Sequence, residues 1–304
     1  MAISKRRSAI VRFWADKGMG NKEISDKLGL SESSVRRYLR NSNENKSPKV
    51  LLFDIETSTL NVKTFYIGSR VSIQHYKIMD DWFMLGYAAK MLDDKDVMSE
   101  IVTPEEAIAR DDRRIVEGIW KLINDADVVI AHNAKRFDVR KINWRFAMHN
   151  LPKPQDFQIV DTLIQTQKHF ASSSHKLDFL TSEFSLRKKE DTEFALWVDC
   201  EHGDPKALAY MNHYNESDIW ALQDLYLKIR PWVSSHPNLG LFIDDNDPMC
   251  PYCMSKDLVE DGEYKTSVSS FQCYRCQECG ATPRGRTSSV SKEKRVGLLI
   301  STAR

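Results

Sequence analysis

The segment that most constrains the fold of this 304-residue chain is Val50–Thr57, which reads Val-Leu-Leu-Phe-Asp-Ile-Glu-Thr. Four apolar residues followed by alternating acidic and apolar residues predict a buried β-strand that ends in charge. Successive strand side chains point to opposite faces, so Asp54 and Glu56 should share one face while Ile55 points into the core. Two such carboxylates repel each other unless a cation lies between them, and oxygen ligands suit Mg²⁺ or Mn²⁺. A solvated acidic turn is the alternative that this segment alone leaves open.

Strand and helix patterns alternate from residue 50 onward. Strands are expected at 50–57, 82–89, 97–102, 127–131 and near Ile159, and helices at 103–124, 137–149 and 205–229 and from Thr162 and His175 onward. The segment 127–131 is almost wholly apolar, which predicts a strand buried on both faces. Three strands, a helix, a strand and a helix predict an α/β fold with a mixed sheet covered by helices.

Two further acidic residues lie in predicted helices. Asp138 follows the segment 132–137 and opens a helix, where the helix dipole alone would favour an acid. Asp218 lies four residues after Tyr214, so the two side chains share one helical face. Each position has an ordinary surface explanation when it is considered alone.

Together these residues form three motifs in chain order, Asp54-x-Glu56, Asn133-x₃-Phe137-Asp138 and Tyr214-x₃-Asp218. This order resembles the exonuclease motifs of the DEDD superfamily, and the tyrosine resembles the DEDDy branch, which includes the proofreading domains of DNA polymerases. The resemblance covers roughly residues 50–232. It implies an RNase H-like fold with a five-stranded sheet and flanking helices.

The resemblance also implies an activity, the release of nucleoside 5′-monophosphates from the 3′ end of DNA by two-metal-ion hydrolysis. Four carboxylates would hold the two Mg²⁺ or Mn²⁺ ions, namely Asp54, Glu56, Asp138 and Asp218. Tyr214 would orient the attacking water, because a tyrosine with a pKa near ~10 does not remove a proton unaided. Thr57 and Leu60 match positions that clamp the terminal nucleotide, and Asn133 would position the strand.

His213 offers a rival assignment, because His213-x₄-Asp218 fits the spacing of the histidine-type DEDDh branch. Tyr214 is preferred here for two reasons. Its spacing of four residues aligns it with Asp218, and Asn215 follows it as in related tyrosine-type sequences.

The cysteines indicate a second metal site. Five of the six cysteines lie within residues 250–279, and four of them form two C-x₂-C pairs, Cys250 with Cys253 and Cys276 with Cys279. Four thiolates complete a closed tetrahedral Zn²⁺ site, and the 22 residues between the pairs should form a β-hairpin. The pattern resembles a zinc ribbon. Cys273 is left out of the ligand set, and the isolated Cys200 is expected to be structural.

The N-terminal residues predict a helix-turn-helix. Helices are expected at 8–17, at 21–28 with Asn21 as cap, and at 32–40 with Ser31 as cap, and Gly29 would form the turn. The segment resembles bacterial and phage helix-turn-helix domains, whose second motif helix enters the major groove. The expected contacts are Ser33, Ser34 and Arg37 with base edges and Arg36 and Arg40 with phosphates. A small helical bundle with a basic surface is the alternative.

Charge is distributed unevenly although the net charge is only +1. Residues 1–49 carry 12 Lys and Arg against 5 Asp and Glu, and residues 281–304 carry 6 against 1. Basic ends around an acidic middle indicate arms that bind a polyanion and a centre that binds cations. The expected domains are a helix-turn-helix at 1–41, a linker at 42–49, the exonuclease domain at 50–245, the zinc ribbon at 246–287 and a basic tail at 288–304.

The combination of these modules resembles standalone exonucleases of bacteriophages. It predicts single-stranded 3′ ends of DNA as substrate, duplex DNA as a further partner of the helix-turn-helix, and RNA as another possibility. No window approaches the ~18 apolar residues of a membrane span, and no signal peptide is evident, so a cytoplasmic location (the host cytoplasm for a phage protein) is expected.

Two rival functions remain. A transposase or recombinase nuclease can combine the same modules but needs an aspartate on the first strand, another on the fourth and a late glutamate, which the D-x-E motif and the Tyr-x₃-Asp helix argue against. A DNA-binding regulator with a degenerate nuclease core would not need all four carboxylates.

Overall fold

The computed structural model of the chain describes residues 10–11, 13–15, 17–32, 34–35, 47–65, 68, 72–187 and 192–302. The chain divides into two compact units, Met1–Ser47 with Leu241–Asp245 and Pro48–Gly240 with Asn246–Arg304. Among the described residues, no helix combines the length and the hydropathy that a membrane span requires.

The first unit contains the helix-turn-helix. Helical backbone at 10–11 and 13–15 precedes α2 (Asn21–Leu28), and helical backbone resumes at 32 and 34–35. One buried apolar residue from each of the three helical segments meets the others in a small core, formed by Val11, Ile24 and Val35. The side chains of Trp14 and Leu28 pack against this core.

The turn of this motif follows the expected chemistry, but the start of α2 does not. Gly29 has φ 61°, a left-handed conformation that glycine adopts without a steric cost, and the N–H of Ser34 donates to Ser31 Oγ at 3.2 Å as a helix cap. The expectation that Asn21 caps α2 was wrong. Gly20 is the cap residue, and its N–H donates to the Glu23 carboxylate at 2.8 Å. A side chain of the first turn thus provides the hydrogen-bond acceptor for the backbone N–H at the start of the helix.

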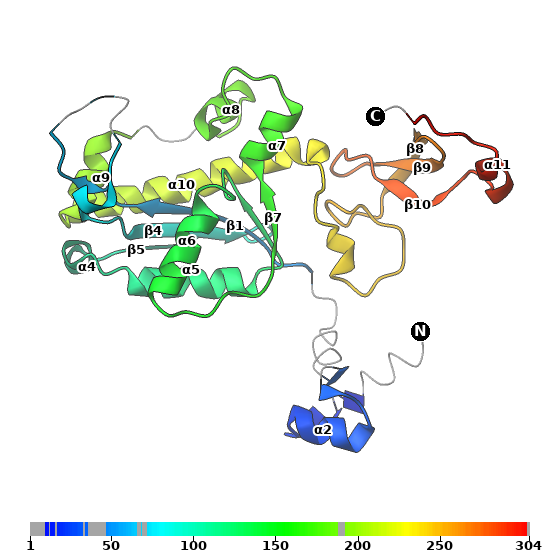
Figure 1. Cartoon of the computed structure of the whole chain (residues 1–304), viewed down its shortest axis with the longest axis horizontal. Helices are drawn as coiled ribbons and strands as arrows, with labels where there is room; N and C mark the ends of the chain where they lie inside the picture. Colours follow the sequence, from blue (N-terminus) through cyan, green and yellow to red (C-terminus); the bar gives the residue numbers. More distant parts are fainter. Residues whose placement is uncertain are drawn as a thin grey trace. The chain divides into compact units, whose positions relative to one another are not determined.

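The second unit is built on a five-stranded mixed sheet in the order β5-β4-β1-β6-β7 (Figure 1). The strands are β1 (Val50–Thr57), β4 (Met84–Met91), β5 (Met98–Ile101), β6 (Val128–Ala131) and β7 (Gln158–Asp161). β4 runs antiparallel to β1 and to β5, whereas β6 runs parallel to β1 and to β7. This arrangement confirms the expected RNase H-like fold class.

Helices cover both faces of the sheet. They are α4 (Pro104–Ala109), α5 (Arg113–Asp125), α6 (Asp138–Met148), α7 (Thr162–His169), α8 (Leu177–Glu183), α9 (Phe194–Glu201) and α10 (Pro205–Ile229). The long helix α10 lies along one face and contacts β1, β4 and β5, while α5 and α6 lie on the other (Figure 1). The limits of α10 match the expected helix, because Asp204 caps it and a proline occupies its first position.

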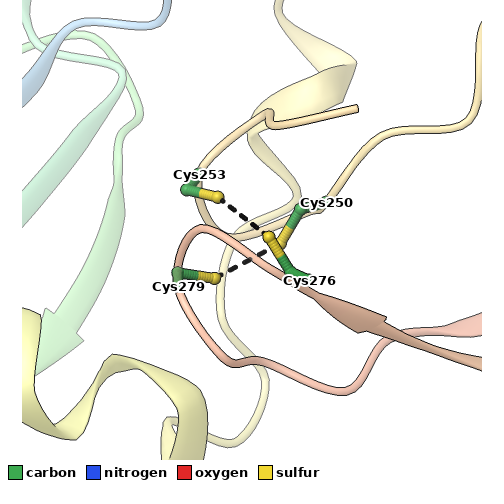
Figure 2. A group of neighbouring side chains, drawn as sticks. All are labelled: Cys250, Cys253, Cys276 and Cys279. Atoms are coloured by element: carbon green, nitrogen blue, oxygen red, sulfur yellow. Dashed lines mark hydrogen bonds between the residues drawn. The ribbon is translucent and has the colours of Figure 1, made fainter. Parts of the chain in front are cut away.

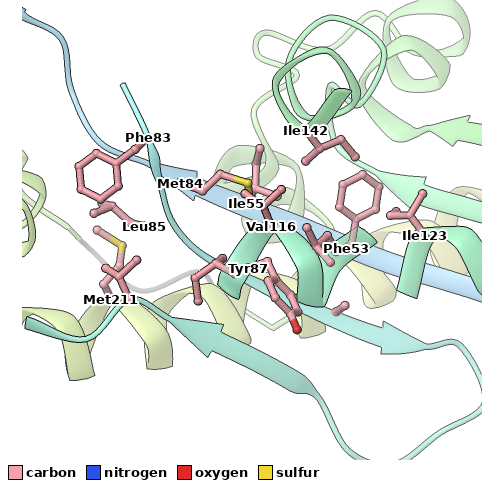
Figure 3. Close-up of a cluster of buried hydrophobic side chains, with 14 of the residues drawn as sticks. Phe53, Ile55, Phe83, Met84, Leu85, Tyr87, Val116, Ile123, Ile142 and Met211 are labelled. Carbon is pink, nitrogen blue, oxygen red and sulfur yellow. The ribbon is translucent and has the colours of Figure 1, made fainter. Parts of the chain in front are cut away.

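The core lies between β1, β4 and α5 (Figure 3). Phe53 and Ile55 of β1 are at most 3% exposed, and α5 buries one apolar stripe that includes Ile115, Ile119 and Ile123. Removing such side chains from water is the main stabilising contribution to a fold of this size. Because Ile55 points into the core, its neighbours on β1 point to the opposite face.

Some elements differ from the sequence expectation. The single helix expected at 103–124 is divided into α4 and α5 at Arg110, which has φ 55°. The interruption brings the buried Asp112 against β4, where it accepts the Met84 N–H at 2.8 Å, forms an ion pair with Arg145 and lies 2.6 Å from His149 Nε2. A hairpin of β2 (Asn61–Val62) and β3 (Ile78–Asp80), the 3₁₀ turn η1 (His75–Lys77) and the helix α9 were not anticipated.

The C-terminal part of this unit forms a second sheet in the order β10-β9-β8. Its elements are β8 (Leu258–Lys265), β9 (Ser270–Cys276), β10 (Arg284–Ser288) and α11 (Lys292–Val296), preceded by the 3₁₀ turns η2 (Arg230–Trp232) and η3 (Leu239–Leu241). β8 and β9 form the hairpin that the cysteine spacing predicted. β10 extends to Ser288, and α11 lies in the segment expected as a tail.

Candidate functional site

Three carboxylates converge on the face of the sheet that α10 covers. One oxygen from each of Asp54, Glu56 and Asp218 lies within 4.8 Å of the others. Asp54 and Glu56 alternate with the buried Ile55 on β1, so the strand period places both on one face. α10 packs against β1 and brings Asp218, which is 2% exposed, to the same point.

Asp138 lies beside this group in the first turn of α6. It is 1% exposed, and burial first, followed by the nearby charges of Asp54 and Glu56, raises its pKa well above the usual range. Its Oδ1 has no hydrogen-bond partner among the described residues. A buried carboxylate in this setting is unfavourable unless a cation compensates its charge, and an all-oxygen donor set suits Mg²⁺ or Mn²⁺.

Tyr214 lies on the inward face of α10, whereas His213 is exposed. Tyr214 is 3% exposed, and its ring packs edge-on against Trp197 with centroids 6.2 Å apart. Trp197 in turn donates from its indole N–H to Glu56 Oε2 at 3.2 Å. Trp197 therefore links the Tyr214 ring to Glu56, one of the three converging carboxylates. Trp197 was not predicted as a site residue, because nothing in the local sequence pattern of α9 connects it with β1.

Lys141 is a second residue that the sequence analysis missed. Its Nζ donates to Thr57 Oγ1 at 2.8 Å and lies 4.1 Å from the ring centroid of Trp82 and 4.7 Å from that of Phe137. Burial lowers the pKa of Lys141, while the charge of Asp138 opposes this shift. Its position three residues after Asp138 was the available signal, because side chains at that spacing share a helical face.

The remaining substrate-binding candidates lie around the same strand ends. Asn133 has φ 74°, a conformation that asparagine tolerates better than most residues, and its N–H donates to Asp161 Oδ1 at 3.1 Å. The other oxygen of Asp161 accepts the N–H of Lys135 at 3.0 Å, so this carboxylate fixes the loop between β6 and α6. Leu60 is 42% exposed, just beyond the end of β1.

The four paired cysteines meet at the base of the second sheet (Figure 2). All four Sγ atoms lie within 4.8 Å of one another, and the Sγ atoms of Cys250 and Cys279, and of Cys253 and Cys276, are 3.6 Å apart. Burial raises the pKa of the Cys250 thiol to about 11, so its thiolate needs a compensating cation. Four sulfur donors at this separation fit a tetrahedral Zn²⁺ ion.

The two other cysteines lie outside this cluster. Cys273 is in β9, and Cys200 is fully buried in α9, where burial raises its thiol pKa to about 12. Such a thiol is unreactive near neutral pH.

The DNA contacts proposed for the helix-turn-helix are largely outside the described part of the chain. These are Ser33, Arg36, Arg37 and Arg40. Ser34 is described. Its N–H donates to Ser31 Oγ at 3.2 Å, and its hydroxyl accepts a hydrogen bond from Ser31 Oγ at 2.9 Å.

Comparison with known proteins gives two family matches. The RNase_H superfamily model matches residues 51–230, and a model described as Homeodomain-like domain matches residues 4–51. No curated protein matches the chain. Among solved structures, the family B DNA polymerase from the hyperthermophilic archaeon Pyrobaculum calidifontis matches with a TM-score of 0.45 and 19% identity, over 62% of this chain and 25% of the polymerase. The chain thus spans about a quarter of that polymerase's length.

Proposed function

The chain belongs to the RNase H superfamily, and from this premise we propose that it is a metal-dependent 3′→5′ exonuclease that releases nucleoside 5′-monophosphates from DNA. The observation that carries the proposal is the convergence of Asp54, Glu56 and Asp218, with ligand oxygens within 4.8 Å of one another, beside the buried Asp138. This charge density is unfavourable in a metal-free protein and suits a pair of divalent cations.

Four carboxylates would bind the metal ions. Asp54, Glu56 and Asp218 would hold one Mg²⁺ or Mn²⁺ ion, and Asp138 would help Asp54 to hold a second. Bound cations of this kind activate water and stabilise the leaving oxygen in phosphodiester hydrolysis.

Other residues would orient the substrate and the water. Tyr214 would position the attacking water, while Trp197 packs on the Tyr214 ring and donates a hydrogen bond to Glu56. Thr57 and Leu60 would clamp the terminal nucleotide. Lys141, which already holds the Thr57 hydroxyl, would present a positive charge to the substrate phosphate.

Two accessory modules would hold the nucleic acid. The cysteine cluster would bind one structural Zn²⁺ ion as a zinc ribbon, because four protein thiolates leave no open position for catalysis. The Homeodomain-like segment would bind duplex DNA and favours DNA over RNA as substrate. In this form the protein would resemble standalone exonucleases of bacteriophages.

The test is hydrolysis of single-stranded DNA labelled at either end. With Mg²⁺, a 5′ label should give a ladder that shortens progressively, and a 3′ label should be released as a mononucleotide. Reactions without Mg²⁺ should omit the metal rather than add a chelator, because a chelator would also remove zinc. Internal cuts or strand-transfer products would instead support a transposase-like nuclease, and the absence of hydrolysis would support a regulator.

Asp218→Asn is the matched test of the site. It should reduce hydrolysis by more than about 100-fold, because even outer-shell partners of metal sites cost about 10–100-fold. The control is Asp224→Asn on the same helix, whose carboxylate forms an ion pair with Arg187 at 3.5 Å. Activity of Asp218→Asn close to that of the control would remove the proposed site.

A further inference from the structure

The sheet of the zinc ribbon has two faces of different chemistry. In an antiparallel pair, directly opposite residues share a face, and alternate residues of one strand share a face. Register therefore groups Tyr264, Phe271, Arg275 and Arg284 on one side, here named the aromatic face. The same register places Glu260, Glu263, Gln272 and Tyr274 on the opposite side.

The rings of the aromatic face are arranged around a guanidinium group. Tyr264 lies directly opposite Phe271, and Arg284 reaches over both, 4.2 Å from the Phe271 ring centroid and 5.1 Å from that of Tyr264. Tyr264 is nevertheless 50% exposed. A tyrosine ring and a guanidinium plane held open to solvent on a sheet are surfaces on which a planar ring can stack.

Two arginines, Arg275 and Arg284, lie on the aromatic face by register. Residues 281–304, which include β10 and α11, carry 6 Lys and Arg against 1 acidic residue. Arg275 forms an ion pair with Asp261 at 2.7 Å. By register, the β8 glutamates Glu260 and Glu263 lie on the opposite face. A polyanion would therefore approach the aromatic face rather than the opposite one.

The combination of stacking surfaces and positive charge selects a class of ligand. Unpaired nucleotides present both π-faces and phosphates, whereas the bases of a duplex already stack on one another. We propose that the aromatic face binds single-stranded DNA, with unpaired bases stacking on Tyr264 and on the Phe271–Arg284 pair. The choice of DNA rests on the proposed nuclease function, while the stacking geometry does not.

The ribbon is joined to the helix that carries Asp218. The ring of Tyr252 in the ribbon packs on His236 with centroids 4.6 Å apart, and His236 Nε2 lies 2.8 Å from the Tyr226 hydroxyl on α10. Tyr226 follows Asp218 by eight residues, which is ~12 Å along a helix. A strand bound to the ribbon would thus remain tethered to the nuclease core between cleavages.

The test measures binding separately from hydrolysis. Full-length, zinc-loaded protein in buffer without Mg²⁺ is titrated into fluorescent oligothymidylate, and Kd is followed by anisotropy. Tyr264→Ala should raise Kd by about 5- to 150-fold, the loss of one stacked base, whereas Tyr264→Phe should stay within about twofold. The control Tyr274→Ala, on the opposite face of the same sheet, should leave Kd unchanged. Equal zinc content and melting temperature exclude unfolding as the cause.

Salt dependence distinguishes stacking from charge. Tyr264→Ala should leave the slope of log Kd against log salt unchanged, because it removes no charge. Arg284→Ala should flatten that slope by about 0.7, the value for one phosphate contact with a single strand. Binding of dextran sulfate, a polyanion without bases, should not respond to Tyr264→Ala.

Each remaining outcome decides one question. If Tyr264→Ala binds oligothymidylate as tightly as the wild type, the proposal that bases stack on the aromatic face is wrong. Tighter binding of oligouridylate than of oligothymidylate would overturn the choice of DNA. If the protein has no exonuclease activity but Tyr264→Ala weakens binding of oligothymidylate, the aromatic face binds single strands and only the proposed function is overturned.

Discussion

Asp138→Asn should raise the stability of the metal-free protein while it abolishes hydrolysis. The side chain is 1% exposed, its Oδ1 has no partner among the described residues, and its neighbours include Asp54 and Glu56. Asparagine keeps the shape and removes the charge. An unsatisfied buried polar group costs about 1–3 kcal/mol, and more when it is charged. Asparagine remains an unsatisfied polar group, so the gain is the extra cost of the charge, which is of the same order, about 1–3 kcal/mol. Because 1 kcal/mol shifts the melting temperature of a domain of this size by about 2–4 °C, the gain should be about 2–12 °C.

The matched comparison is Asp112→Asn, which changes another fully buried aspartate. Asp112 is 0% exposed but is paired with Arg145 and His149 and accepts the Met84 N–H. Removing one partner of a buried ion pair costs about 3–5 kcal/mol, so this variant should melt at a lower temperature than the wild type. The same substitution should therefore have opposite signs at the two positions.

Calorimetry or dye-based melting of zinc-loaded protein measures both variants, first without Mg²⁺ and then with it. Mg²⁺ at ten times its Kd should stabilise the wild type by about 1.4 kcal/mol and Asp138→Asn by less, since a ligand is missing. The reasoning would be refuted if Asp138→Asn melted below the wild type without Mg²⁺, or if Mg²⁺ raised both melting temperatures equally.

Four further predictions concern the site and the ribbon. Tyr214→Phe should slow turnover by about 10- to 1000-fold and His213→Ala should not, and the reverse result would assign the catalytic role to the histidine. Lys141→Met should raise the KM for DNA and Lys141→Arg should largely restore it, which steady-state kinetics measures. Cys276→Ser should lose one equivalent of zinc and unfold the ribbon, because zinc binding and folding of such small domains are coupled, while hydrolysis of short single strands persists. Burial lowers the pKa of His236 from 6.5 to about 4, so between those pH values the unfolded chain takes up a proton that the native chain does not. The free energy of unfolding should thus fall by up to roughly 3 kcal/mol as the pH drops through this window, and His236→Gln should flatten the pH profile of the melting temperature.

Much of the sheet could be read from the sequence, because strand and helix periods depend on neighbouring residues. The alternation in Val50–Thr57 placed Asp54 and Glu56 on one face before any contact was known. The start of α10 at Pro205 was likewise expected from the local sequence. The cysteine spacing likewise anticipated a cluster with a hairpin between its halves.

Other features required the tertiary structure. Arg110 interrupts a continuous helical pattern, and the reason is the place that Asp112 takes against β4. The roles of Trp197 and Lys141 arise from contacts with Glu56 and Thr57, residues far away in the chain.

The contrast between two buried aspartates shows the physical reason. Asp112 and Asp138 are both at most 1% exposed. A sequence motif marks Asp138 as a candidate metal ligand, but no local pattern shows which charges surround either aspartate. The sequence determined which side chains are charged and which face of an element they occupy. Packing decided that Asp112 meets the Arg145 guanidinium and the His149 ring, whereas Asp138 meets other carboxylates. The order of strands and helices sets which charges share a low-dielectric interior.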